Sequence, residues 1–236
     1  MDLNTSRLVC FALKEEAAPF RKIAAGGLRD SHPVSILLTG IGRQNAEKSI
    51  REFLVSNSPE LVLTCGFAGG LNPDLKIGDV VFEIPSRISR GNEAQTEIGN
   101  KMEPPHVGCY DKLIAAGAKP AKFFCADRIA TTIAEKKALR EQTGADAVEM
   151  ESAAIHAVCA ERGIPCATVR VISDTANEDL PLDFNRLSKP DKSLDFGKLF
   201  LAISKSTGKI GPLMELRRKT KFAAERLAEV LNEIIR

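Results

Sequence analysis

The feature that most constrains this fold is the alternation of short apolar runs with longer segments of helical periodicity. An apolar run at residues 8–12 precedes a helical pattern at 14–24, and a second run at 34–38 precedes one at 43–55. A third apolar run follows at 60–65. Strands that alternate with helices form sheets covered by helices on both faces. We therefore predict an α/β fold, a three-layer α/β/α domain with a central mixed sheet.

The rest of the chain continues this pattern. No Pro/Ser-rich linker and no internal repeat interrupts it, so we expect a single domain over residues 1–236. The later apolar runs predict strands at 79–83, 122–125 and 166–172. The later helical patterns predict helices at 111–116, 134–142, 151–162 and 219–235.

Two stretches depart from the pattern. Residues 84–105 are polar and contain glycine, which predicts a loop or flap. Residues 188–221 carry nine Lys or Arg against three Asp or Glu, with apolar residues between them. We expect a basic amphipathic C-terminal segment at about 188–236, which either packs on the protein or lies against an anionic membrane.

Composition excludes several classes of protein. The 33 Lys+Arg and 31 Asp+Glu residues leave a net charge of +2, so we expect no nucleic-acid partner. No apolar run approaches the ~18 residues of a membrane span, and the N-terminus lacks a secretory signal pattern. We therefore expect a cytoplasmic protein, with the membrane-peripheral location as the alternative. Six cysteines without a C-x-x-C pair and three scattered histidines predict reduced packing residues and no metal site.

Three carboxylates follow apolar strands. Glu16 comes after the first strand, Glu151 after the apolar residues 147–148, and Asp174 after the strand at 166–172. The carboxyl ends of strands in an open sheet are where α/β proteins bind ligands, so the three are expected to converge there. Taken alone, each one is better explained as a solvated carboxylate at a helix start, which the helix dipole favours.

Two glycine-rich segments, at 39–43 and 65–70, are predicted to be turns after strands. Their missing side chains would let backbone N–H groups approach a sugar or an anion, although tight turning alone also explains them. Neither has the spacing of a P-loop or a dinucleotide fingerprint.

Five segments in order resemble the superfamily of purine nucleoside phosphorylases and 5′-methylthioadenosine/S-adenosylhomocysteine nucleosidases. They are residues 12–16, 39–42, 64–71 with 76–81, 148–154 and 170–176. The second half of the chain is most similar to the hopanoid-associated phosphorylases, which act on adenosylhopane. That similarity lies in residues 126–132, 136–145 and 211–216.

The resemblance implies a division of catalytic roles. Asp174 would give a proton or a strong hydrogen bond to purine N7, and its acceptor capacity would favour adenine over 6-oxopurines. Glu16 would activate water, as in the hydrolytic members. Glu151 would bind the ribose hydroxyls, with Met150 against the sugar. Further substrate-binding positions implied by the resemblance are Glu149, Ile129, Phe67, Gly66 and Ser173.

The sequence also departs from the superfamily pattern. Thr64 and Phe67 stand where bacterial phosphorylases carry a phosphate-binding arginine and serine, which weakens the case for phosphorolysis. Gly42 and Arg43 are the remaining candidates for holding a phosphate or another anion. No cofactor is expected, and either water or phosphate is the co-substrate. Ile129 replaces the nucleosidase's adenine-stacking phenylalanine, which predicts aliphatic packing and backbone contacts to the base.

Three functional hypotheses remain at this stage. The first is cleavage of the N-glycosidic bond of an adenine nucleoside with a bulky, adenosylhopane-like 5′ substituent, because the shortened segment at 84–109 predicts an open 5′ pocket. The second is the same chemistry on small metabolites such as methylthioadenosine. The third is a nucleoside-binding relative without activity. In each case the partner is a small-molecule nucleoside, and we expect a homo-oligomer.

Overall fold

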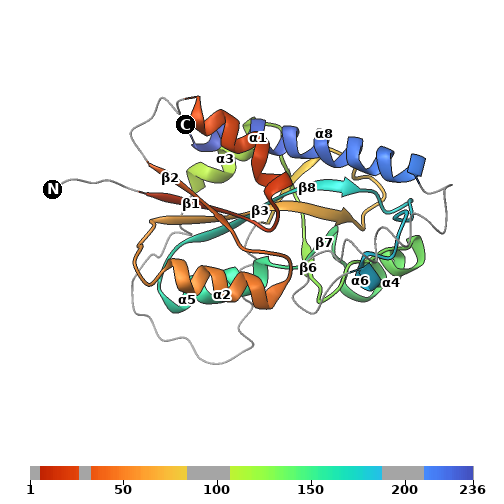
Figure 1. Ribbon diagram of the computed structural model, residues 1–236, viewed down its shortest axis with the longest axis horizontal. Helices are drawn as coiled ribbons and strands as arrows, with labels where there is room; N and C mark the ends of the chain where they lie inside the picture. The colour runs from red at the N-terminus through yellow and green to blue at the C-terminus, as the bar shows by residue number, and fades with distance from the viewer. Residues whose placement is uncertain (1–5, 27–32, 84–106, 188–209, 236) are drawn as a thin grey trace, which may run out of the picture.

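The computed structural model describes residues 6–26, 33–83, 107–187 and 210–235 of the chain (Figure 1). Within these residues the centre is an eight-stranded mixed sheet in the order β2-β1-β3-β8-β4-β5. Strand β7 pairs with β3 and with β6. The strands are β1 (Arg7–Phe11), β2 (Val34–Leu38), β3 (Leu61–Gly70), β4 (Val80–Phe82), β5 (Lys119–Pro120), β6 (Phe123–Cys125), β7 (Ala147–Glu149) and β8 (Cys166–Asp174).

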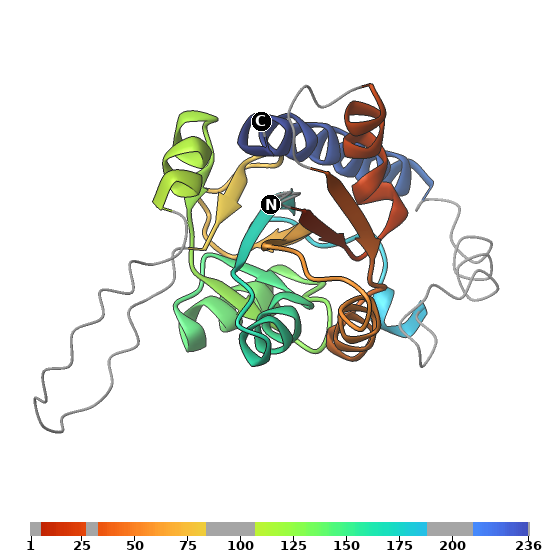
Figure 2. The same cartoon turned by 90° about the vertical axis from the view of Figure 1, so that its left-hand side faces the viewer.

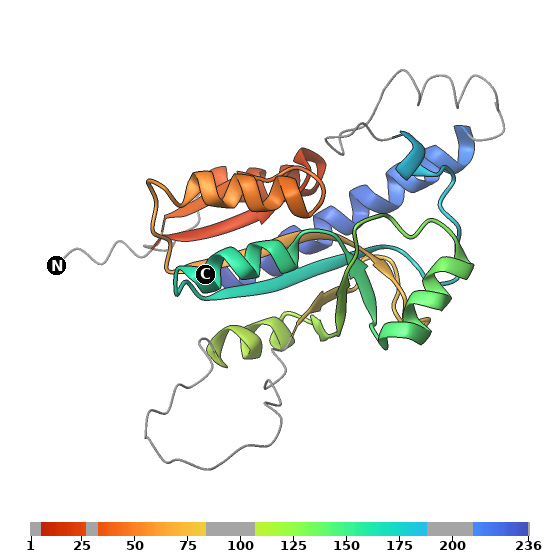
Figure 3. The ribbon, with the colours of Figure 1, turned by 90° about the horizontal axis from the view of Figure 1, so that it is seen from below.

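Helices cover both faces of this sheet, which confirms the predicted three-layer α/β/α class. The helices are α1 (Lys14–Ala25), α2 (Arg43–Phe53), α3 (Val107–Ala115), α4 (Ile133–Thr143), α5 (Ser152–Glu161), α6 (Phe184–Leu187) and α8 (Ile210–Ile235). Helices α1, α3 and α8 lie on one face (Figures 1 and 2). Helices α2 and α5 lie on the other, the face seen in Figure 3.

Each helical layer encloses its own apolar core against the sheet. Phe11, Phe20 and Phe82 are buried beneath α1 and α8, and Leu8 and Ile155 belong to the core beneath α2 and α5. The buried strands present apolar side chains to both layers, as expected for a sheet covered on both faces. No helix within the described residues is both long enough and apolar enough to cross a membrane.

Strands β3 and β8 determine where functional groups can gather. They run in parallel, with Gly66 beside Arg170, so their carboxyl ends meet at the same edge of the sheet. An irregularity between Ala68 and Gly69 brings Gly69 beside Asp174. Helices α4 and α6 and the start of α8 lie at this end of the molecule (Figure 1).

The structure corrects three boundaries, the first of which is the start of α3, at Val107 rather than at 111. Residues 65–70, predicted as a turn, continue β3, because β8 on one side and β7 on the other supply pairing partners. Helix α8 begins at Ile210 rather than at 219. The short strand β5 and the short helix α6 were not predicted, whereas β7 lies at the apolar residues expected to precede Glu151. The loop predicted at 84–105 and the first part of the basic segment, 188–209, lie outside the described residues.

Candidate active site

Glu16 is a buried carboxylate in the first turn of α1, with 4% of its surface exposed. One oxygen accepts a hydrogen bond from the backbone N–H of Leu13, at the start of the same helix (2.8 Å). The other accepts from the N–H of Phe67 on β3 (2.8 Å). Glu16 therefore serves as a helix cap and also reaches the central strands, so it is not a solvated surface carboxylate.

Arg170 lies at the centre of the site and is almost completely buried, with 1% exposed. Its Nη2 atom lies 2.6 Å from a carboxylate oxygen of Glu149, and Nη1 lies 3.4 Å from one of Glu151. Thr64 Oγ1 and the Cys65 carbonyl also accept hydrogen bonds from the guanidinium. The Arg170 Nε atom has no hydrogen-bond partner among the residues that the structure describes.

The backbone at Gly66 lets Glu16 and Arg170 approach each other. Gly66 has φ of 143°, and a Cβ atom there would lie 2.7 Å from Glu16 Oε1 and 2.9 Å from Arg170 Nη1. Any larger residue would have to displace one of the two charged groups. The predicted close backbone approach at Gly66 thus serves side chains of the protein itself.

Glu151 connects this group to the start of α2. Its Oε1 accepts a hydrogen bond from the backbone N–H of Gly42 (2.8 Å), the residue that precedes α2. Gly42 was predicted to offer its N–H to an anion, and the group bound there is the carboxylate of Glu151. Arg43, the other anion candidate, points instead to Asp127, at 3.6 Å, and is half exposed.

Glu149 is the most fully hydrogen-bonded carboxylate of the group. Besides Arg170, it accepts hydrogen bonds from the backbone N–H groups of Glu151 and Ser152 and from the Ser152 hydroxyl. Its oxygens are therefore occupied by donors of the protein. We interpret Glu149 as the residue that holds Arg170 and the start of α5, rather than as a substrate contact.

Three carboxylates against one guanidinium leave surplus negative charge in a buried place, and the pKa values respond accordingly. Burial raises the pKa of Glu16 to about 7, and Glu151 adds to the rise. Burial also raises the pKa of Glu151, because Arg170 offsets only part of the cost. Burial opposes the charge of Glu149, but Arg170 and Ser152 outweigh it and lower the pKa.

Asp174 occupies a second, separate environment at the end of β8. Its Oδ1 accepts a hydrogen bond from the hydroxyl of Ser173 (2.7 Å). Its Oδ2 lies 2.6 Å from Nζ of Lys136, a residue of α4 that is completely buried. Asp174 therefore shares a strand with Arg170 but pairs with a different cation.

The remaining predicted residues lie around these two groups. Met150 is buried between Glu149 and Glu151, and Phe67 is half-buried. The backbone N–H and C=O of Ile129 both bond to the side-chain amide of Asn185 (2.9 Å each). Backbone contacts from Ile129 to a base, as predicted, would first have to displace that amide. The half-buried side chain of Ile129 takes no part in these two hydrogen bonds, which involve only the Ile129 backbone.

Sequence reasoning missed Arg170 and Lys136 as site residues, and only Arg170 left a signal. Arg170 sits inside the apolar strand at 166–172, where a charge is expensive to bury without a partner. Lys136 left none, because Ile133, three residues before it on the same side of the helix, is exposed at 43% and marks no buried face.

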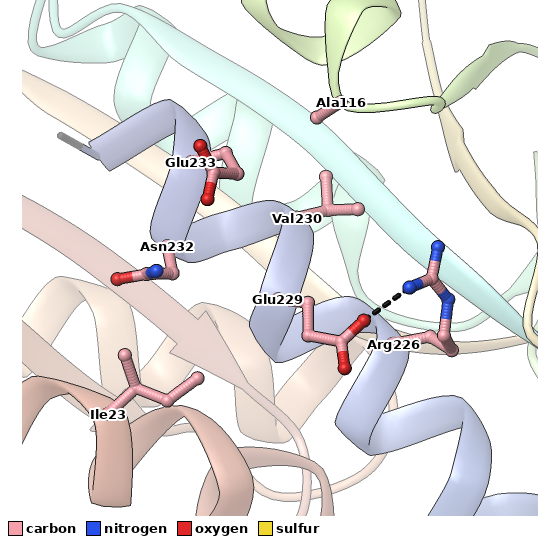
Figure 4. A pocket seen from close by; sticks show the side chains of 7 residues that line it. All are labelled: Ile23, Ala116, Arg226, Glu229, Val230, Asn232 and Glu233. Atoms are coloured by element: carbon pink, nitrogen blue, oxygen red, sulfur yellow. Dashed lines mark hydrogen bonds and ion pairs between the residues drawn. The ribbon is translucent and has the colours of Figure 1, made fainter.

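Two cavities are lined by neither the Arg170 group nor the Asp174–Lys136 pair. One, of about 230 Å³, lies at the C-terminal half of α8, where Arg226 and Glu229 pair with each other (Figure 4). It contains none of the predicted residues. The other, of about 490 Å³, lies between Arg43, the residues from 124 to 128 and the side of α4 that carries Leu139.

The three-layer fold and the buried ionisable groups at the carboxyl ends of its strands define an α/β protein with a candidate active site. A model of the phosphorylase superfamily matches residues 10–205. The chain belongs to the phosphorylase superfamily.

Curated relatives agree with this assignment. The chain is 31% identical to the 5′-methylthioadenosine/S-adenosylhomocysteine nucleosidase of Shewanella halifaxensis, over 64% of this chain and 73% of the relative. It is 31% identical to the protein of the same name from a Marinomonas species, over 69% and 77%. It is 28% identical to the aminodeoxyfutalosine nucleosidase of Campylobacter jejuni, over 66% and 73%.

Solved structures share the fold along the whole chain. The 5′-methylthioadenosine/S-adenosylhomocysteine nucleosidase of Helicobacter pylori, solved with butyl-thio-DADMe-Immucillin-A, has a TM-score of 0.68 at 19% identity, covering 99% of each chain. The futalosine hydrolase of the same species has a TM-score of 0.67 at 18% identity, covering 100% of this chain and 99% of that one.

Proposed function

We propose that this protein cleaves the N-glycosidic bond of an adenine nucleoside, with Glu16 as the general base and Asp174 as the acid at the leaving base. The observation that carries the proposal is the pairing of two unlike carboxylate environments along β3 and β8. Glu16 has a pKa near neutrality, which suits a group that takes up a proton at physiological pH. Asp174 stands beside a buried cation at the other end of the site.

The proposed reaction balances as a hydrolysis. Glu16 accepts a proton from water, the water oxygen bonds to C1′, and the C1′–N9 electron pair leaves with the base. Asp174, which takes up a proton before the reaction, gives it to N7, so that adenine departs neutral. Exchange with solvent then removes the proton that Glu16 has gained and restores the one that Asp174 has lost. The sugar passes through a cation-like transition state, which the surplus negative charge around Glu151 would stabilise.

The charge balance favours water over phosphate as the acceptor. Arg170 is engaged by three oxygen-bearing side chains, those of Glu149, Glu151 and Thr64, and is not free to bind a dianion. Phosphate approaching this group would also meet the carboxylates at short range, which is electrostatically unfavourable.

An activity assay tests this proposal. The protein is incubated with adenosines that differ at the 5′ position, with and without phosphate, and the sugar product is identified. We expect adenine release without phosphate and a free ribose product. Ribose 1-phosphate formed only with phosphate would replace hydrolysis by phosphorolysis, and no adenine release from any member of the panel would refute the proposal.

For the 5′ substituent we propose a bulky apolar group presented from a membrane. The support lies in the first turns of α8, where Met214 and Phe222 are exposed at 68% and 49%. Arg217, Arg218 and Lys221 are exposed on the same stretch. Apolar and basic groups together suit an anionic lipid surface.

This surface lies near the proposed site. Lys219, in the same turns of α8, forms an ion pair with Glu178. The backbone carbonyl of Glu178 accepts a hydrogen bond from Lys136, which pairs with Asp174. A substrate carried on the lipid would therefore reach the site over a short path. Lys219 itself is three-quarters buried and paired, so it contributes less to the exposed charge than expected.

Co-sedimentation tests the membrane proposal. Vesicles containing phosphatidylserine should pellet the protein at low salt, and changing Arg217, Arg218 and Lys221 to Gln should weaken this binding. Changing Lys14, Lys48 and Lys137 to Gln removes the same charge from exposed positions elsewhere and should have a smaller effect. Protein that remains in the supernatant, or equal losses in both variants, would overturn the proposal.

A further inference from the structure

Lys136 is an unusual residue for a helix interior. Its side chain is 0% exposed, yet a lysine is almost never completely buried unless it is paired. Its ammonium group reaches the Asp174 carboxylate at 2.6 Å, the Thr175 carbonyl at 2.6 Å and the Glu178 carbonyl at 2.9 Å. All three ammonium protons therefore have acceptors, and a single carboxylate shares the charge.

Two independent anchors hold Lys136 in place. Helix α4 begins with a capping box, in which Thr132 and Glu135 bond reciprocally to the backbone. The chain after Asp174 is tied to the same region, because Asp179 accepts a hydrogen bond from the N–H of Ile133 (2.7 Å). The Lys136 ammonium is thus delivered to Asp174 by a rigid helix start, and not by a flexible surface side chain.

We propose that Lys136 is a positioning residue for departure of the base, and that it acts through Asp174. The inference rests on the proposed function, in which Asp174 gives a proton to N7. When that proton leaves, the carboxylate left behind lies 2.6 Å from a buried cation that stabilises the new charge. Ser173 holds the other carboxylate oxygen, so the two residues together fix the orientation of the group.

This role predicts a dependence on the leaving group. Adenine requires a proton at N7 to leave as a neutral molecule, whereas p-nitrophenolate is stable as an anion and leaves without one. Substitution of a residue that acts through Asp174 on the base should therefore lower kcat for adenosine and hardly change kcat for p-nitrophenyl β-D-ribofuranoside. Substitution of a residue that only stabilises the fold should lower the rate with both substrates by the same factor.

The test compares Lys136→Met with the wild-type enzyme on these two substrates. We expect kcat for adenosine to fall about 10- to 100-fold, part of the effect of general acid catalysis, with kcat for the nitrophenyl riboside nearly unchanged. Because both rates come from one preparation, their ratio does not depend on how much of the variant is folded. Lys137→Met is the matched control, since Lys137 is the next residue on α4 and its side chain is 76% exposed.

A double-mutant cycle provides the second measurement. In the Asp174→Asn background, Lys136→Met should lower kcat for adenosine little further, because Asp174, the residue through which Lys136 acts, has already been replaced. Equal losses on both substrates, or full additivity with Asp174→Asn, would overturn the inference while leaving the proposed function intact. A wild-type enzyme that releases no adenine would instead refute the proposed function.

Discussion

The two buried ionic groups at the carboxyl ends of β3 and β8 differ in charge balance. Around Arg170, three carboxylates share one guanidinium, whereas at Asp174 one carboxylate faces one ammonium group. In the first arrangement burial raises the pKa of Glu16, and the excess negative charge from Glu151 adds to the rise. The second is balanced within the pair. The comparison teaches that two buried carboxylates near the ends of neighbouring strands can stand in unlike charge environments, one within a group of excess negative charge and one beside a cation of its own.

The largest effect is expected from Asp174→Asn, which removes the acid from the balanced pair. The amide retains the shape of the side chain but cannot give a proton to N7, so kcat/KM for adenine nucleosides should fall by about 10²–10⁴-fold. Steady-state kinetics on the variant and on Asp74→Asn, an exposed carboxylate elsewhere, would measure this. A folded Asp174→Asn protein with wild-type rates would remove Asp174 from the reaction.

The next effect concerns the group with excess charge. Glu16→Gln removes the proposed base, and hydrolysis should fall by about two orders of magnitude, whereas a phosphate-dependent reaction would retain much of its rate. In the wild-type enzyme the rate should rise with pH through about 7, because the base must be ionised. Glu15→Gln, at the exposed neighbouring position, should leave the rate and its pH profile unchanged. A profile without this limb would contradict the role of Glu16.

The raised pKa of Glu16 also predicts how the stability of the protein depends on pH. Its pKa is about 7 in the folded protein and 4.5 when unperturbed, so between these values the folded state retains a proton that the unfolded state has released. The contribution of protonated Glu16 to the free energy of unfolding is fully present below pH 4.5 and is lost as the pH rises through 7. The loss amounts to about 3 kcal/mol. Urea unfolding of wild-type and Glu16→Gln proteins at pH 5 and pH 8 measures the difference. A constant gap between the two proteins would contradict the raised pKa.

The smallest effect is a loss of stability in Gly66→Ala, which distinguishes the cost of a close contact from the cost of backbone strain. Gly66→Ala should destabilise the fold by about 2–3 kcal/mol, because its Cβ would collide with Glu16 and Arg170. Gly117→Ala is the control, since Gly117 also has a positive φ, of 83°, but no atom of the described residues lies within 4 Å of its Cβ position. It should cost about 1 kcal/mol, from strain alone. Equal losses in thermal unfolding would show that the contact at Gly66 contributes nothing.

The sequence allowed the layered fold and much of the carboxylate group to be predicted, because each depends on local pattern. Glu16 and Glu151 follow strands whose carboxyl ends meet, and the structure brings both to Arg170. Asp174 lies on the same strand as Arg170, as its position after 166–172 implies.

The partners of these carboxylates could not be predicted in the same way. Lys136 lies 38 residues before Asp174, in a polar stretch whose other lysine, Lys137, is exposed. Only the packing of α4 against the end of β8 decides which of the two is buried. The continuation of β3 beyond Cys65 was missed for a related reason: glycines have no strand propensity of their own, and pairing with β7 and β8 supplies what they lack.

The position of Glu16 in the first turn of α1 has a consequence for how this protein can change over time. One oxygen of this side chain closes the helix and the other reaches toward the proposed chemistry. A substitution that alters the chemistry therefore also loosens α1, whose Phe20 belongs to the core beneath α8. A substitution of Glu16 would thus lower both the activity and the stability of the protein. We therefore expect changes of substrate specificity to arise at residues that do not also stabilise the fold.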